Sequence, residues 1–176
     1  MPTRWDGTLD DLPEGMDEAI RRGLEGGANV LCALLIAIPS VQRGKHISTD
    51  ALRGMIELAR QHGLSCLIAP VRPTWKERYP LTPIERYAQW RRHDGLPFDP
   101  WIRIHERLGG RILRAAPRSI RITGTVTEWE EWTGMVFPER GEYVFPGGLT
   151  TLEIDRESDE GRYWEPNVWM RHEAGL

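Results

Sequence analysis

The chain has 176 residues, a formal net charge of −3 and an apolar share of 40%, which fits one globular domain with a core. The balanced charge supplies no basic field, so we expect neither nucleic acid nor a membrane surface as a partner. The longest apolar run, residues 30–38, is well short of the roughly 18–20 residues of a membrane span. The start of the chain shows no signal-peptide pattern. Both cysteines, Cys32 and Cys66, lie in apolar runs, so we expect free thiols in a cytoplasmic protein rather than a disulfide.

In the first half of the chain, apolar runs alternate with a helical pattern. A short helix is expected near residues 16–24, and a buried strand over 30–38 is stopped by Pro39. The next helix begins at Ser48 or Thr49, either of which can cap it, and ends at Gly63. A second buried strand follows over 64–69. Strand, helix and strand at this spacing predict a βαβ unit with two parallel strands.

The second half is expected to be rich in β-strands. Before it, the proline-rich stretch 70–100 carries a capping-box pattern at Thr82-Pro83-Ile84-Glu85, which predicts a helix to about Arg92. Asp99-Pro100 opens another helix, which ends at Gly109-Gly110. Strands are expected at 111–115, 119–126, 143–145, 149–154 and 163–170. The fold class is therefore α/β with a mixed (α+β) sheet.

The segment most indicative of chemistry is Gln42-Arg43-Gly44-Lys45-His46-Ile47-Ser48, between the first strand and its helix. A basic loop that contains glycine and leads into a helix N-terminus can bind an anion, because unpaired amides and the positive end of the helix dipole converge there. The spacing fits neither the P-loop nor the dinucleotide fingerprint.

Residues 43–48 resemble the pyrophosphate loop of the GNAT-type acyltransferase superfamily, which has the form [Q/R]-x-x-G-x-[G/A]. They match at Arg43 and depart from it at His46 and Ser48. The segment His105-Glu106-Arg107-Leu108-Gly109-Gly110 is similar to the family phrase Tyr-x-x-x-Gly-Phe, with His105 at the tyrosine position. The resemblance spans residues 30–113.

The resemblance implies a single GNAT-like domain over 1–176: a lead-in (1–29), a cofactor-binding unit (30–113) and a β-rich acceptor-side portion (114–176). It implies acetyl-CoA, another acyl-CoA or a carrier thioester as co-substrate, with a small-molecule amine attacking the thioester directly. His105 is then the candidate acid that protonates the thiolate. The residues expected to bind the donor are Ile36, Ile38, Arg43, Gly44, Lys45, His46, Ile47, Ser48 and Thr49.

Carboxylates beside tryptophans in the second half are candidates for the acceptor side. On a strand, Glu128 and Glu130 would lie opposite Trp129 and could serve a cationic amine as base or counter-ion. Glu165 is a further candidate base. For each of these residues a packing or surface role remains open, as does a role for His105 in the core. Arg72 and Lys76 either meet an anion or hold a structural loop. No spacing of His and Cys indicates a metal site.

Two other functions are compatible with the sequence. Family members place further strands ahead of the cofactor strand, whereas only residues 1–29 precede Val30. The C-terminal half, or a second copy in a homodimer, could complete the sheet. Alternatively, the chain is a non-catalytic truncated homologue that binds a ligand or partner. A third possibility is an enzyme of this fold that decarboxylates or hydrolyses a thioester.

Overall fold

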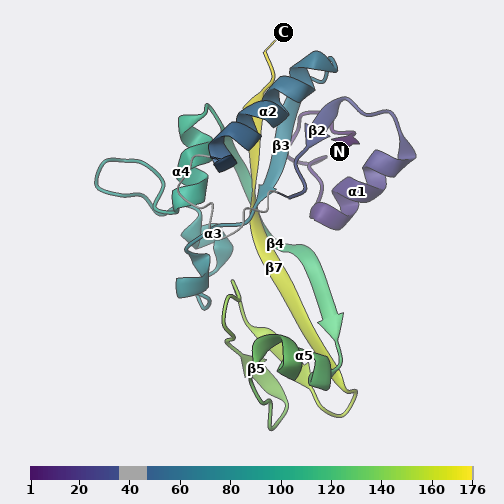
Figure 1. The fold of residues 1–176 in the computed structure, drawn as a ribbon, viewed down its shortest axis with the longest axis vertical. Helices are drawn as coiled ribbons and strands as arrows, with labels where there is room; N and C mark the ends of the chain where they lie inside the picture. The colour runs from purple at the N-terminus through teal and green to yellow at the C-terminus, as the bar shows by residue number, and fades with distance from the viewer. Residues whose placement is uncertain (36–46, 176) are drawn as a thin grey trace.

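The computed structural model describes residues 1–35 and 47–175. Figure 1 shows its helices and strands arranged around two long central strands. The helices are α1 (Met16–Glu25), α2 (Ile47–Gln61), α3 (Ile84–Tyr87), α4 (Pro100–Arg107) and α5 (Val126–Thr133), with a 3-10 turn at Lys76–Arg78. The strands are β1 (Pro2–Thr3), β2 (Val30–Cys32), β3 (Cys66–Val71), β4 (Arg111–Gly124), β5 (Gly141–Tyr143), β6 (Leu152–Asp155) and β7 (Glu160–Glu173).

The seven strands form one mixed sheet in the order β1-β2-β3-β7-β6-β5, with β4 on the other edge of β7. Strands β2 and β3 are parallel, with Leu31 opposite Leu67, and the other pairs are antiparallel. The parallel βαβ unit and the α/β class are therefore confirmed. No helix in the described ranges has the length and hydrophobicity that a membrane span needs.

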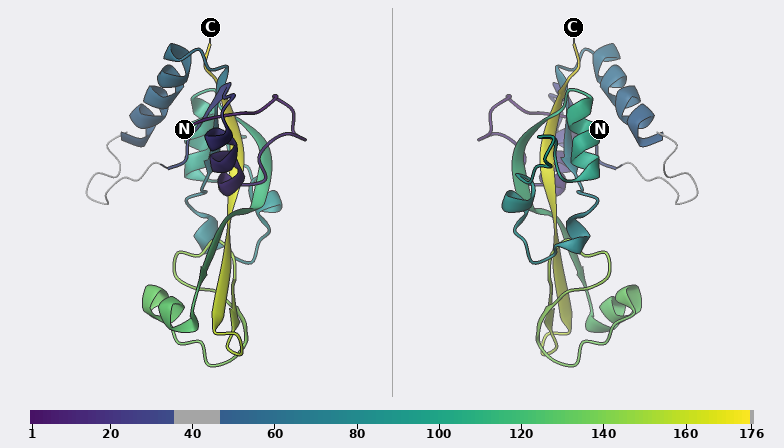
Figure 2. Two further views of the ribbon diagram at one scale, coloured as in Figure 1. Left: turned by 90° about the vertical axis from the view of Figure 1, so that its right-hand side faces the viewer. Right: turned by 90° about the vertical axis from the view of Figure 1, so that its left-hand side faces the viewer.

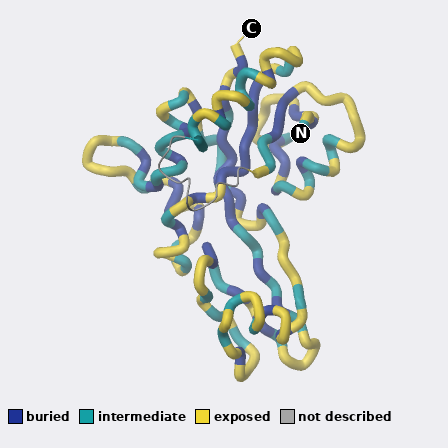
Figure 3. Tube along the Cα trace, in the orientation of Figure 1, coloured by how far each residue is buried: buried dark blue, intermediate teal, exposed yellow. Residues whose placement is uncertain are grey.

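Alternate residues of β2 and β3 point to opposite faces of the sheet and pack into two separate hydrophobic cores. Val30 and Ile68 face Ala19 of α1, in a cluster that also holds Trp5 and Trp169. The residues adjacent to these, Leu31 and Leu67, face Leu52 and Ala59 of α2. The C-terminal half of β3 packs against α3 and α4. The sheet is thus covered by α1 on one face and by α2, α3 and α4 on the other, and its central strands are buried (Figure 3).

Strands β4 and β7, each of 14 residues, continue beyond this body as a ribbon (Figure 2). At its far end β5, β6 and α5 pack around Trp129, Phe137, Leu152 and Tyr163. We call residues 124–161, which span this far end, the arm. The two strands predicted at 111–115 and 119–126 are one strand, with an irregular register between Ala116 and Ile120.

Several predicted boundaries are wrong. Helix α2 begins at Ile47, so Ser48 and Thr49 lie inside its first turn and do not cap it. Helix α3 has four residues, and its N-cap is Pro83 rather than Thr82. By contrast, Asp99 caps α4 as predicted, accepting from the amides of Trp101 and Ile102. Cys32 and Cys66 are free and buried, and burial raises the pKa of the Cys32 thiol to about 12.

Candidate active site

The parallel pair β2–β3 separates part-way along β3. Cys32 lies opposite Ile68, and the amide of Ala33 donates to the Ile68 carbonyl at 2.9 Å. Beyond this point the described residues Leu34 and Leu35 make no backbone hydrogen bond to β3. Strand β3 nevertheless continues to Val71, paired through its other edge with β7.

Pro70 suits the place where β2 leaves β3. Backbone groups of alternate residues point to the same edge of a strand, so Pro70 faces the edge that Ile68 shares with β2. Because proline has no N–H, no donor is left unpaired at this position. Pro70 therefore favours a gap between β2 and β3, which the pantetheine arm of a thioester donor would require.

Helix α2 starts at the residues predicted to hold the donor. Ile47, Ser48 and Thr49 form its first turn and are partly buried. The first amides of a helix have no partner within it and carry the positive end of its dipole. Of the nine predicted donor-binding residues, the other six lie outside the described ranges: Ile36, Ile38, Arg43, Gly44, Lys45 and His46. Binding of a diphosphate there stays a prediction.

His105 lies on the buried side of α4, with 2% of its surface exposed. Its Nδ1 is 2.9 Å from Nε2 of His172 on β7, and its ring meets the Trp101 ring edge-on at 4.5 Å between centroids. Burial, followed by the charge of His172, lowers the pKa of His105 to about 3, and burial also lowers the pKa of His172. Both rings are therefore neutral at pH 7. These contacts favour a role in packing, and a role as general acid stays a prediction.

From the burial of His105 and His172 we predict that the folded protein loses stability in mild acid. Because the folded-state pKa of His105 lies below its unfolded value near 6.5, the unfolded chain takes up the proton first. Stability from this group is thus fully present above pH 6.5 and declines as the pH falls from 6.5 towards 3. The unfolding free energy of the wild type is expected to fall between pH 7 and pH 5.5. In His105→Gln this fall should be smaller by about 1 kcal/mol, as measured by urea denaturation.

The exposed His93 offers a matched control. His93→Gln should leave the pH dependence of the wild type unchanged, because this side chain is exposed and lies outside the buried histidine pair. Equal pH slopes for His105→Gln and the wild type would contradict the prediction.

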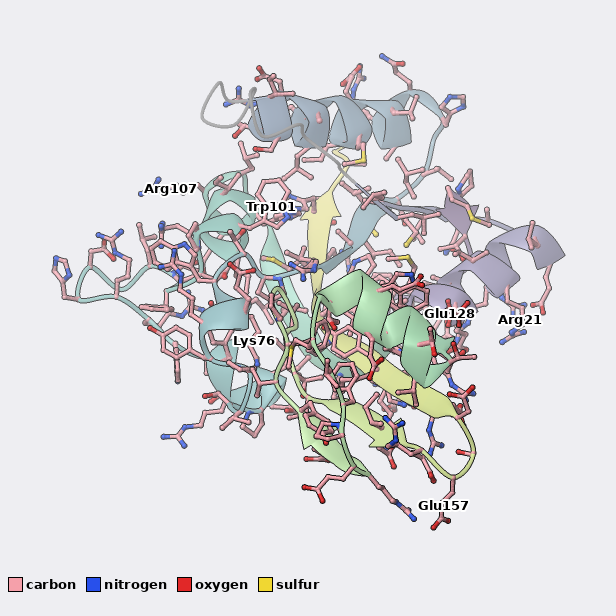
Figure 4. The ribbon with its side chains drawn as sticks, turned by 60° about the horizontal axis from the view of Figure 1, so that its bottom comes forward. Arg21, Lys76, Trp101, Arg107, Glu128 and Glu157 are labelled. Carbon is pink, nitrogen blue, oxygen red and sulfur yellow. The ribbon has the colours of Figure 1, made fainter. Side chains whose placement is uncertain are left out.

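Glu128 and Glu130 lie on a helix, so the predicted strand of alternating carboxylates and tryptophans is wrong. Thr125 and Glu128 form a reciprocal capping box at the start of α5. Glu130 accepts from the amide of Phe137 at 3.1 Å and lies 3.9 Å from Arg156. Helix α5 sits in the arm, at the opposite end of the molecule from α2 (Figure 1), and Figure 4 shows Glu128 there. Both carboxylates therefore stabilise the arm locally.

Glu165 lies near the end of β3. Its carboxylate is 3.0 Å from Nε of Arg72, the residue that follows β3, and Arg72 also donates to the Gly147 carbonyl at 2.8 Å. The structure thus places Glu165 beside β3, the strand from which β2 separates. Glu128 and Glu130 lie far from it, in the arm. Its role as a base stays a prediction.

Comparison with known proteins found similarity in structure and in sequence. No family model matches the chain. The loading GNATL domain of CurA from Lyngbya majuscula superposes with a TM-score of 0.53 at 14% identity, over 84% of this chain and 56% of that one. In sequence, the chain is 33% identical over 190 residues to the arginine N-acetyltransferase avaD of Aspergillus versicolor. The chain therefore has a GNAT-like fold and a sequence related to that of an N-acetyltransferase. The sequence match covers 93% of this chain and 66% of avaD, which is just under two thirds of the relative's length.

The burial of Lys76 was not predicted from the sequence. Lys76 is 1% exposed, and its Nζ donates to the carbonyls of Tyr79 at 2.8 Å, Pro80 at 3.4 Å and Leu149 at 2.5 Å. The amide of Leu149 in turn donates to the Tyr163 hydroxyl at 2.9 Å. Burial lowers the pKa of Lys76 to about 8. Lys76 therefore fastens the loop before β6 to the segment after β3, which supports the structural interpretation of this residue.

Proposed function

We propose that this GNAT-like chain transfers an acyl group from acetyl-CoA or another acyl-CoA to the amine of a small molecule. The observation that carries the proposal is the separation of β2 from β3 beside the N-terminus of α2. The diphosphate would lie at Arg43–Thr49, and the pantetheine arm along Ile36–Ile38. The avaD relative is named for acetyl transfer to arginine, which supports an amine as acceptor.

The proposed reaction is a direct displacement. The neutral amine nitrogen attacks the thioester carbonyl, the C–N bond forms, the C–S bond breaks, and the thiolate takes up a proton. Glu165 is the proposed base that receives the proton of the ammonium form, which requires it to leave Arg72. The proton that the thiolate takes up is the one released by the new amide nitrogen, and His105 remains the proposed donor of a hydrogen bond to the sulfur through its neutral ring. The free thiols Cys32 and Cys66 support a cytoplasmic location, and a homodimer stays a prediction.

Two matched variants at the start of α2 test donor binding. Ile47 occupies the first helical position, where proline is tolerated but lacks the N–H. Ile47→Pro and Ile47→Ala lose the same side-chain packing, yet only the first loses an amide. We expect isothermal titration to show acetyl-CoA binding by the wild type and by Ile47→Ala, and binding at least about tenfold weaker by Ile47→Pro.

Two outcomes would overturn the proposal. One is a wild-type chain that binds neither CoA nor acetyl-CoA at millimolar concentration. The other is CoA release, followed with a thiol reagent, at the same rate with and without an amine, because that identifies thioester hydrolysis.

A further inference from the structure

A groove of about 300 Å³ opens between the start of α3, the arm and the β4–β7 ribbon. It lies just beyond β3. The last residue of β3, Val71, pairs with Val168, and Pro166 on the groove wall is two residues nearer the arm. Lys76, also in the wall, follows β3 closely and sits between α3 and the arm (Figure 4). The groove therefore adjoins the strand that forms one side of the proposed donor site.

The groove combines an apolar part, formed by prolines with Leu81 and Ile84, with two carboxylates from different elements. Glu85 comes from the first turn of α3, and Glu142 comes from β5 in the arm. In the described part of the chain, neither carboxylate makes an ion pair or accepts a hydrogen bond from a side chain or amide, unlike Glu130 and Glu165. The rest of the wall holds Lys76, Leu81, Ile84, four prolines and three threonines.

Lys76 presents none of its N–H donors to the open groove. Its ammonium group is buried and faces the carbonyls of Tyr79, Pro80 and Leu149, so its donors are already used within the wall. The same contacts hold Leu149, and with it the adjoining Thr150 and Thr151, in place. The exposed ionic groups of the groove are thus the two carboxylates, while the ammonium of Lys76 lies buried in the wall.

Resting on the proposed function, we propose that this groove binds the side chain of a basic amino acid as the acceptor. Its aliphatic stem would lie along Leu81, Ile84 and the prolines, where an apolar contact covers it from water. Its guanidinium or ammonium group would pair with Glu85 and Glu142, each of which can accept charge-assisted hydrogen bonds. The α-amine would then point back towards the end of β3, where the thioester is expected.

L-arginine and L-citrulline distinguish charge from shape, because citrulline has the same stem with a neutral end. We expect isothermal titration without any CoA to show arginine binding at least about tenfold tighter than citrulline binding. Glu85→Gln and Glu142→Gln should each weaken arginine binding about tenfold and raise its KM while leaving kcat close to the wild-type value. Glu77→Gln changes an exposed carboxylate outside the groove and should alter neither.

The possible results separate the groove from the proposed activity. Equal affinity for arginine and citrulline would overturn the inference. So would unchanged KM values in both groove variants of a chain that acetylates arginine, which would leave the proposed function standing with the acceptor bound elsewhere. Carboxylate-dependent arginine binding by a chain that binds no acyl-CoA would support the ligand class and overturn the proposed function instead.

Discussion

Replacing Asp99 with alanine is expected to lower the free energy of unfolding by about 3–4 kcal/mol. Asp99 is 2% exposed and accepts from the amides of Trp75 at 2.8 Å and Trp101 at 2.9 Å, and from the Tyr87 hydroxyl at 2.8 Å. One carboxylate thus joins α4, α3 and the segment after β3. Its removal leaves donors from three segments without an acceptor in the interior. Urea denaturation followed by tryptophan fluorescence measures the change.

Two milder variants check the cause. Asp99→Asn keeps one acceptor oxygen and should cost less than the alanine variant, and Tyr87→Phe removes a single donor and should cost about 1 kcal/mol. A loss below 1 kcal/mol in Asp99→Ala would show that the cluster of donors is satisfied in another way.

Trp169→Ala is expected to cost about 3–5 kcal/mol of unfolding free energy. The Trp169 side chain is fully buried in the cluster that joins Trp5, Val30 and Ile68, so the truncation opens a cavity between the sheet and α1. Trp132→Ala makes the same chemical change at an indole that is 56% exposed, and should cost about 1 kcal/mol or less. Similar losses in the two variants, measured by chemical denaturation, would contradict this account.

Elements with a strong local signal could be predicted from the sequence. The apolar residues of β2 and β3 with a helix between them predicted the parallel pair, because a continuous apolar run needs burial on both faces. The Asp99-Pro100 pair predicted the start of α4, since a carboxylate at the N-cap and proline at the next position both suit a helix entrance.

Where two local signals competed, the prediction was wrong. Residues 125–128 carry a capping-box pattern, which favours a helix, whereas the alternation of Glu and Trp over 128–132 favours a strand. In the structure the cap decides, because Trp129 then faces the core of the arm with Tyr163. The capping pattern that begins at Thr82 was misleading. The N-cap of α3 is Pro83, and no side chain makes a capping hydrogen bond there.

The candidate site was harder to predict because its parts are distant in the chain. Arg72 and Glu165 are 93 residues apart and meet through the antiparallel pairing of β3 with β7. His105 and His172 are 67 residues apart and meet where α4 packs on the sheet. Lys76 likewise gave no sequence signal of burial, since its partners are backbone carbonyls, which any residue could supply.

Strands β4 and β7 both run from the body into the arm, with one irregularity of their pairing between Ala116 and Ile120. Residues 160–163 of β7 lie beside β6, and residues 168–173 of the same strand lie beside β3. The arm therefore has no linker at which it could melt while the body stays native. Heating or denaturant should unfold the whole chain in one cooperative step. A destabilising substitution in the arm should therefore lower the stability of the body as well, because β4 and β7 belong to both.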